Sequence, residues 1–514
     1  MSHIIGIDIG TSGIKVGAMN KEGELGCLEY QPYSLLYPQM GWVEIDLEDI
    51  WGRTKTLLTK VWQQVETSGT VDAISLSTFC NSSVFLDEQG TPLYPGILYL
   101  DQRSKGEADW VKAVVGEDLL YQVTKNRLEP GMYTVTSYLW FKNHFPELYA
   151  KTYKWGNLST FILHKLTGNF VMDWTQSSFT GMYDVENYHW SSEIYKKVGV
   201  DQDKLPEVVD PCSIIGYFEH PELQSNQIPV IAGAADTACS AVALGLGVNE
   251  MFESVGTSNV LTVCTDQTKH LDTRFLNRCH VLKNRWLSHG AMSFPGVAIQ
   301  WYYEQFLKSD GHTRSIYEEL CRQSTAGANG VFFLPYMQGE RAPIWDPNAR
   351  GVFAGIHLNT SKADMFRAIL EGCSFGLRQI NEIIETKYRI HPESFPSIGG
   401  GAKNREWAQI KANVLKQNIH IKDISETGVL GACLIASTAV GYYSSLEQAA
   451  EKISNHTIYS VAPEDDLLDT YDGLYQVFNE LYPSLKQFFA ISAEQSIKGG
   501  ERIETDNLYN KVTT

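Results

Sequence analysis

The stretch GIDIGTSGIK at residues 6–15 decides the fold. An apolar run ends in a Gly-Thr-Ser-Gly turn and a second apolar run follows, which predicts two tightly joined antiparallel strands opening an α/β domain. Asp8 lies within the first strand, so we expect it to be hydrogen-bonded, near a metal ion or at the mouth of a cleft. The turn's glycines, amides and hydroxyls can cradle phosphate oxygens. Alternatively, the turn only closes a hairpin and its amides satisfy Asp8.

A second copy of this pattern occurs near the middle of the chain. VGTS at residues 255–258 follows one strand-like run and precedes another, as IGTS does at residues 9–12. This echo predicts an internal duplication. A chain of 514 residues also exceeds what one hydrophobic core usually supports. We therefore expect one domain over residues 1–247, a second over 248–490, and a polar tail over 491–514.

Hydrophobic periodicity predicts the elements that follow the opening hairpin. A helix is expected from Leu47 to about Val65, and a strand at Ala73–Ser77 comes after it. Another strand at Ile228–Gly233 leads to Asp236 and a helix reaching Gly245. In the second half we expect helices over about 363–388 and 404–416, separated by the glycine-rich residues 397–402.

Composition excludes several classes of function. A formal net charge of -18 argues against an electrostatic grip on nucleic acid or on an anionic membrane. The nine cysteines include no CxxC pair, which is typical of reduced thiols. No signal-peptide pattern and no membrane-length apolar run is present, so we expect a cytoplasmic protein.

Two further segments are candidates for chemistry. Asp236 follows a predicted strand, where it either caps the next helix or accepts a proton from a substrate hydroxyl. The glycines at 399–401 either form a flexible connection or let a helix start approach a nucleotide. His280 and His289 lack metal-ligand spacing and are expected to be structural.

Taken together, these motifs resemble the FGGY carbohydrate kinases over residues 4 to about 445. The matching segments are GIDIGTSGIK at 6–15, GWVE at 41–44 with Asp46, LTG at 166–168 with Asp173, GAAD at 233–236, SVGTS at 254–258, GVAIQW at 296–301, GERAP at 339–343, DPNARGVFAGI at 346–356 and GGAKN at 400–404. Their number and order make the resemblance far more specific than any single motif.

The resemblance implies two actin-like (ribonuclease H-like) domains, with ATP and a sugar meeting in the cleft between them. The first would bind sugar and the second nucleotide. Asp236 would be the general base, and Asp8 would hold Mg²⁺, mostly through water. The implied nucleotide-binding residues are Thr11, Ser12, Lys15, Gly256, Thr257, Gly296, Gln300, Gly400, Gly401, Ala402 and Asn404. A homodimer is expected from the family alone.

Departures from the family pattern bear on the sugar. Xylulose kinases carry Gln-Met-His-Gly where this chain has FCNS at 79–82, so Asn81 replaces their sugar-binding His. They also have Asn where this chain has Thr237. Asp101 and Arg103 resemble the Asp-x-Arg of xylulose and gluconate kinases, so the implied substrate-binding residues are Asn81, Asp101, Arg103, Asp236 and Thr237. A xylulose-like ketopentose is favoured, with gluconate or a polyol as alternatives.

Two other functions remain open. An actin-like ATPase or chaperone could share the core, although the GERAP and DPNARG blocks resemble sugar-kinase features. A non-catalytic sugar sensor is disfavoured because Asp8 and Asp236 are both present.

Overall fold

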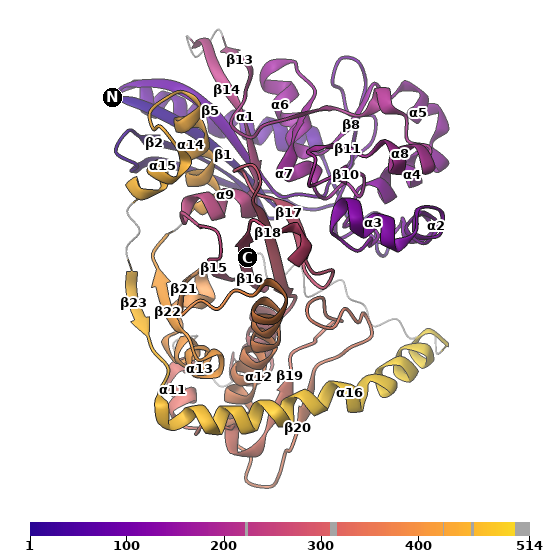
Figure 1. Cartoon of the computed structure of the whole chain (residues 1–514). Coiled ribbons are helices and arrows are strands. Elements are labelled where there is room, and N and C mark those ends of the chain that lie inside the picture. The colour runs from indigo at the N-terminus through magenta and orange to yellow at the C-terminus, as the bar shows by residue number, and fades with distance from the viewer. Residues whose placement is uncertain (221–224, 309–315, 425, 454–456, 499–514) are drawn as a thin grey trace.

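The opening stretch forms the predicted hairpin. In the computed structural model, β1 (Ser2–Gly10) pairs antiparallel with β2 (Gly13–Asn20), so that Asp8 lies opposite Lys15. The structure describes residues 1–220, 225–308, 316–424, 426–453 and 457–498. Two lobes follow one another along most of the chain, each built on one large sheet (Figure 1).

The first sheet has six strands in the order β13-β14-β5-β1-β2-β3. The other strands are β3 (Leu25–Pro32), β5 (Thr70–Thr78), β13 (Ile214–His220) and β14 (Ser225–Ala235). β1, β5 and β14 run parallel, whereas the remaining pairs are antiparallel. Since parallel strands end at the same edge, Asp8, Ser77 and Asp236 come together there.

The second sheet repeats this plan. Its order is β17-β18-β16-β15-β21-β22-β23. The strands are β15 (Met251–Val255), β16 (Asn259–Thr265), β17 (Leu276–Cys279), β18 (Trp286–Met292), β21 (Ser394–Ile398), β22 (Asn418–Lys422) and β23 (Thr457–Val461). The run β18-β16-β15-β21-β22 matches β3-β2-β1-β5-β14 in order and direction. Residues 256–258 thus occupy the place of the first turn, and the predicted duplication is confirmed.

Helices form where the periodicity predicts them. α1 (Leu47–Glu66) begins at Asp46, whose side chain accepts the backbone N–H groups of Glu48 and Asp49, and its buried residues face the first sheet. α9 (Asp236–Ala243) follows β14, while α12 (Lys362–Ile383) and α13 (Arg405–Leu415) cover the second sheet. The insertion between β5 and β14 carries α2 (Lys105–Val115), α3 (Glu117–Thr124), α4 (Val135–His144), α5 (Pro146–Lys151), α6 (Leu158–Thr167), α7 (Trp174–Ser177) and α8 (Ser192–Lys197).

One helix of the second half returns to the first lobe. α14 (Thr427–Ala439) packs against β1, β5 and α9, beside the first sheet in Figure 1. The approach requires glycines: a Cβ on Gly6 would lie 2.5 Å from the Val429 carbonyl oxygen, and one on Gly431 would lie 2.1 Å from that of Cys239. The domain boundary between residues 247 and 248 stays a prediction. Although α14 follows this boundary in the sequence, it packs against the first lobe.

The end of strand β17 and the residue after it also form hydrogen bonds to the first lobe. The Cys279 amide donates to the Ser178 hydroxyl at 3.0 Å, and the Trp174 indole donates to the His280 carbonyl at 2.8 Å. Burial lowers the pKa of His280 to about 3 and holds that of His289 well below its usual value, so both rings are neutral. This agrees with their expected structural role.

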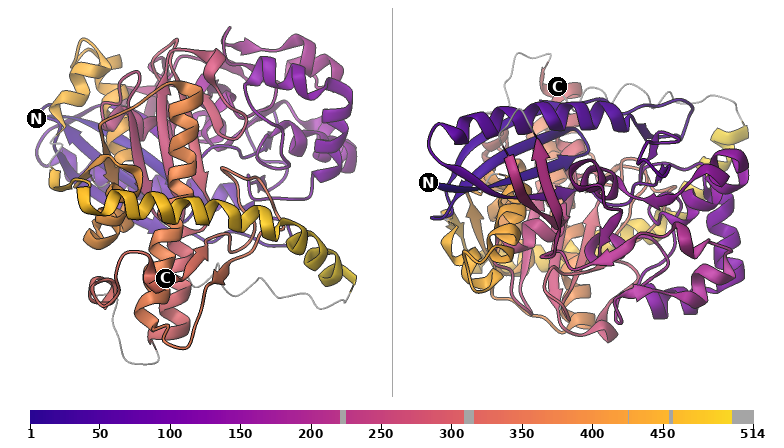
Figure 2. Two further views of the ribbon diagram at one scale, coloured as in Figure 1. Left: turned by 60° about the horizontal axis from the view of Figure 1, so that its bottom comes forward. Right: turned by 90° about the horizontal axis from the view of Figure 1, so that it is seen from above.

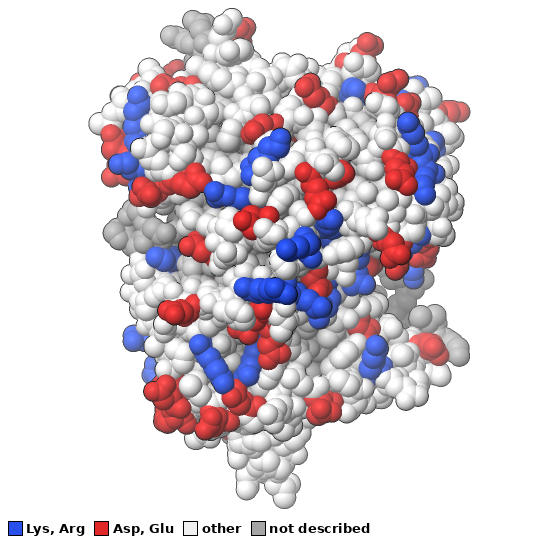
Figure 3. Space-filling view, in the orientation of Figure 1, with Lys and Arg blue, Asp and Glu red and all other residues white. Residues whose placement is uncertain are grey.

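The C-terminal part differs in extent from the predicted tail. α16 (Leu468–Lys498) lies along the outside of the second lobe (Figure 2), so residues 491–498 are helical, whereas residues 499–514 lie outside the described part. None of the helices among the described residues is long and apolar enough to cross a membrane. Acidic and basic side chains are interspersed on the face shown in Figure 3.

Candidate active site

Asp8 lies at the carboxyl edge of the first sheet, under the start of α14. Its Oδ1 accepts the Ser77 hydroxyl at 2.7 Å, and a Cβ on Gly428 would lie 2.4 Å from the same oxygen. Burial raises the pKa of Asp8 to about 6. The Ser77 bond and Lys15 oppose this shift, while Asp236 and Glu426 reinforce it. The site therefore concentrates negative charge that has little protein compensation.

Asp236 begins α9 directly after β14 and remains partly exposed. Its Oδ1 accepts the Thr237 backbone N–H at 2.6 Å and the Thr237 hydroxyl at 3.1 Å. Within the described residues no group donates to Oδ2. Ala235, not Asp236, holds the N-cap position, so the carboxylate is not committed to capping. One oxygen is held in place and the other is available to a substrate.

The backbone before Asp236 is anchored by a buried chain of hydrogen bonds. The Ala235 amide donates to the Thr175 hydroxyl at 2.9 Å, and Thr175 in turn donates to Asp173 Oδ1 at 2.5 Å. Asp173 also caps α7, and burial raises its pKa to about 7. Asp173 and Thr175 thereby position the strand end that carries Asp236.

Lys15 lies opposite Asp8 in the β1–β2 hairpin, whose turn joins Gly10 to Gly13. Lys15 projects from β2 and forms an ion pair with Glu426 at 2.7 Å. The Ser12 carbonyl accepts the Tyr33 amide at 3.4 Å, which fixes the turn, whereas the Thr11 and Ser12 side chains stay partly or fully exposed. A phosphate-binding role for these three residues stays a prediction.

Glycines of three separate segments meet at the end of β15. The Gly296 amide, at the start of α10 (Pro295–Tyr302), donates to the Thr257 carbonyl at 3.0 Å, and a Cβ there would lie 2.1 Å from the Gly256 oxygen. A Cβ on Gly399 or Gly401 would lie 2.5 Å or 2.6 Å from atoms of Val255. The predicted nucleotide-binding segments are thus brought together.

Other predicted nucleotide-binding residues have structural partners. The Asn404 side chain caps α13 by accepting the Trp407 amide at 3.0 Å. Ala402 is buried beside Gly400 in a short 3-10 turn, and Gln300 on α10 donates to Glu304 at 2.6 Å. Their contacts with a nucleotide stay predictions.

Asp101 and Arg103, which are predicted to bind the sugar, form a closed network. Both Asp101 oxygens accept from Arg103, and Oδ2 also accepts the Val43 amide at 2.6 Å. The guanidinium contacts Glu44 and stacks 3.7 Å from the Trp42 ring centroid. With these groups occupied by protein, the geometry favours a positioning role, and direct substrate contact stays a prediction.

Asn81, in contrast, keeps one side-chain atom that a ligand could bind. It adopts a left-handed backbone conformation with φ of 67°, and its amide donates to the Met132 carbonyl at 2.6 Å. Its Oδ1 is buried without a donor among the described residues. An acceptor buried without a partner is costly, so it is suited to a ligand hydroxyl.

Several site residues carried no recognisable sequence signal. Ser77, Glu426 and Gly428 reach Asp8 only through the parallel strand register and the return of α14. Within the described ranges, no three His, Cys, Asp or Glu side chains are grouped closely enough to hold a metal ion directly. An ion at Asp8 would need water or a substrate to complete its shell.

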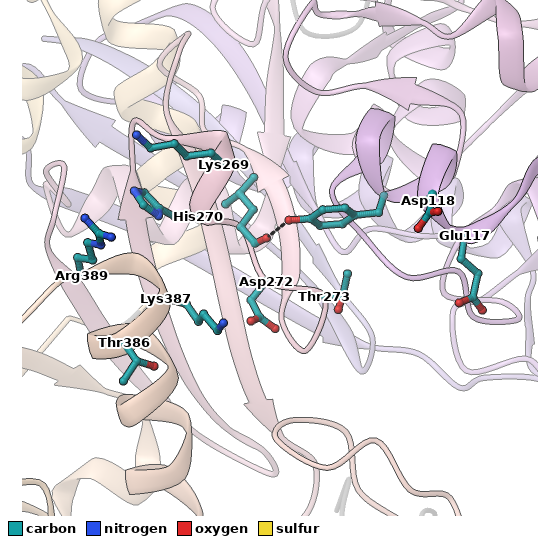
Figure 4. A pocket seen from close by; sticks show the side chains of 11 residues that line it. Glu117, Asp118, Lys269, His270, Asp272, Thr273, Thr386, Lys387 and Arg389 are labelled. Atoms are coloured by element: carbon teal, nitrogen blue, oxygen red, sulfur yellow. Dashed lines mark hydrogen bonds between the residues drawn. The ribbon is translucent and has the colours of Figure 1, made fainter.

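A cavity of about 650 Å³ lies away from these residues (Figure 4). Basic residues Lys269, Lys387 and Arg389 lie on one side and Glu117 and Asp118 of α3 on the other. The Tyr121 hydroxyl bridges it by donating to the Leu271 carbonyl at 2.6 Å. None of the predicted site residues lines this cavity, so the prediction of chemistry at Asp8 and Asp236 does not rest on it.

The raised pKa of Asp8 should be visible in stability. A carboxyl with a pKa of 3.8 unfolded and about 6 folded contributes most stability below the lower value and loses it as pH rises through the higher. We expect Asp8→Asn to stabilise the unliganded protein by about 2–3 kcal/mol above pH 6, and by roughly half as much near pH 5. Urea unfolding of both proteins at the two pH values measures this; a variant less stable at both would contradict it.

Two sequence models of one family match both halves of the chain. The N-terminal domain of the FGGY family of carbohydrate kinases matches residues 3–243, and its C-terminal domain matches residues 251–440. A xylulose kinase of Staphylococcus xylosus is 29% identical, over 94% of this chain and 100% of its own. A gluconokinase of Bacillus licheniformis is 27% identical, over 94% and 96%.

Solved structures agree with the sequence matches. A gluconate kinase of Lactobacillus acidophilus superposes with a TM-score of 0.87 at 25% identity, over 94% of this chain and 98% of its own. The predicted fold of two actin-like (ribonuclease H-like) domains is thereby confirmed. With its duplicated sheets and its carboxylates at the predicted strand ends, the chain belongs to the FGGY family of carbohydrate kinases.

Proposed function

We propose that the protein transfers the γ-phosphoryl group of ATP to a primary hydroxyl of a small open-chain sugar or sugar derivative, with Asp236 as general base. The observation that carries this is the pairing of Asp8 with Asp236 at one sheet edge, where Asp236 Oδ2 has no donor among the described residues. A family kinase needs such an acceptor for the hydroxyl proton.

We assign a separate role to each group of residues according to its position. Thr237 and the Asp173–Thr175 anchor hold Asp236 so that Oδ2 can accept the proton as the hydroxyl attacks phosphorus. Asn81 Oδ1 would accept a hydrogen bond from a sugar hydroxyl. The glycines of the segments at 256–257, 296 and 399–401 have no side chains, so the nucleotide would be able to approach their backbone closely. Positioning and water exclusion supply most of the rate in phosphoryl transfer.

ATP is the phosphate donor of the family's sugar kinases, and Mg²⁺ fits the charge of this site. Three carboxylates lie close together here, those of Asp8, Asp236 and Glu426. Lys15 is the nearby cation. Asp8 would hold the ion through water, and the ion would neutralise phosphate charge when bound. Thr11, Ser12 and Lys15 would bind the phosphates themselves.

The acceptor is proposed from the relatives. Proteins described as xylulose kinases and as gluconokinases match over nearly the whole chain. By similarity alone a xylulose-like ketopentose ranks first, and gluconate or a polyol follows. Asn81 and Thr237 differ from the pattern of xylulose kinases, and buried hydroxyl-specific groups discriminate strongly between substrates.

Sugar-dependent ADP release tests the proposal. Purified protein with ATP and Mg²⁺ is assayed against ketopentoses, aldonates and polyols, and the product mass is measured. We expect one class to raise ADP release far above background and to gain one phosphate. ADP release that no sugar alters would instead favour an ATPase acting on a protein, and sugar binding without ADP release would favour a sensor.

A further inference from the structure

A buried guanidinium without a carboxylate partner lies between the two lobes. Arg278 on β17 is only 6% exposed. Its Nη1 donates to the Cys80 sulfur at 3.0 Å, and its Nε has no acceptor within the described part of the chain. No carboxylate of a described residue lies within ion-pair distance of it. Burying such a charge is costly unless a counter-ion is supplied.

Two other cations that are buried in the described part of the chain, Lys411 and Arg103, are paired with carboxylates. Lys411 contacts both oxygens of Glu253, and Arg103 contacts Asp101 and Glu44. Each of these pairs lies within 2.7 Å. Arg278 instead rests on the Phe179 ring, 4.5 Å from its centroid. Lys411 and Arg103 therefore have carboxylate partners, whereas Arg278 has none among the described residues.

The surroundings of Arg278 belong to the sugar side of the site. Cys80 precedes Asn81; burial raises the pKa of the Cys80 thiol, Arg278 opposes this shift and the negative charge of Asp236 adds to it. Tyr133 packs against the same Phe179 ring, and its buried hydroxyl has no partner among the described residues; neither does Nε2 of His289. Unsatisfied polar atoms therefore gather where Arg278 reaches the first lobe, and they require a ligand or water.

We propose that Arg278 binds a carboxylate on the acceptor, so that an open-chain sugar acid is preferred over a neutral ketose of the same length. This rests on the proposed kinase function. A guanidinium presents a planar fork that matches a carboxylate, and such charge-assisted bonds are among the strongest in proteins. The acid group would lie at Arg278 and the primary hydroxyl, at the other end of the carbon chain, would reach Asp236. A neutral ketose leaves the guanidinium unpaired.

Steady-state kinetics of four proteins test this. Wild type, Arg278→Met, Arg278→Lys and Arg274→Met are assayed with five- and six-carbon aldonates and ketoses. Arg274 is the matched control, since it lies on the segment preceding β17, is 40% exposed and pairs with Asp272. We expect wild type to prefer aldonates. Arg278→Met should raise the KM for aldonates about 100-fold while the ketose KM changes only a few-fold.

The lysine variant separates charge from fork geometry. Arg278→Lys keeps the cation but loses bidentate contact, so its aldonate KM should fall between those of wild type and Arg278→Met. Arg274→Met should match wild type. If Arg278→Met does not fold, the substrate preference of the wild type and the aldonate KM of Arg278→Lys still test the proposal.

Three results would overturn the inference. These are a wild-type preference for neutral ketoses, an equal loss of kcat/KM for acids and ketoses in Arg278→Met, and an unchanged aldonate KM in Arg278→Lys. Turnover of ketoses alone would refute only the carboxylate site. If no sugar raises ADP release, the kinase proposal itself fails.

Discussion

Replacing Asp236 with Asn is expected to lower kcat for the sugar by about 10²- to 10⁴-fold. Asparagine keeps the shape and the Oδ1 contacts with Thr237, but it cannot take up the hydroxyl proton. The KM for ATP should change little, because the glycine segments that we assign to the nucleotide lie in the second lobe. Initial rates of sugar-dependent ADP release at saturating ATP measure the effect.

Asp423→Asn is the control for this experiment. Asp423 is 59% exposed and forms a surface ion pair with Lys403, so its loss should leave kcat unchanged. Thermal unfolding should show that Asp236→Asn is as stable as wild type. A kcat within a few-fold of wild type would mean that Asp236 only begins α9, and another base would have to be sought.

Lys411→Met is expected to destabilise the protein by about 3–5 kcal/mol. Lys411 on α13 and Glu253 on β15 are both fully buried, with Nζ at 2.7 Å and 2.6 Å from the two oxygens. The Ser397 hydroxyl of β21 also donates to Glu253. Removing the cation leaves the carboxylate buried and uncompensated. Urea unfolding of wild type and variant measures the difference.

Two further variants make this result interpretable. Lys403→Met removes a cation from an exposed pair and should cost at most about 1 kcal/mol. Lys411→Met combined with Glu253→Met should recover most of the loss, since apolar residues can replace a buried pair at little cost. Equal effects of Lys411→Met and Lys403→Met would show that the buried pair contributes no more than a surface pair.

The hairpin at residues 6–15 and its echo at 255–258 predicted the internal duplication, whereas the two actin-like domains were implied only by the family resemblance. Their turns and apolar runs are local features, and local chemistry determines them. Asp8 and Asp236 were each singled out from their local sequence, but their meeting at one sheet edge follows from the parallel register of β1, β5 and β14.

Contacts that depend on distant parts of the chain could not be predicted. Glu426 meets Lys15 only because α14 returns to the first lobe, and Arg278 reaches Cys80 only because β17 packs there. Nothing in the sequence near either residue signals this. Asp101 and Arg103 were expected at the substrate, and only the three-dimensional network reveals how fully they engage each other.

The return of α14 bears on how the protein is made. While the chain emerges from the ribosome, the sheet of the first lobe is complete after β14, but the surface around Gly6 stays uncovered until residue 439 has been synthesised. For roughly two hundred residues of synthesis the nascent first lobe exposes apolar surface, a state prone to aggregation. A shortened gene ending near residue 247 would leave that surface permanently bare, so the first lobe is not expected to be soluble when it is expressed alone.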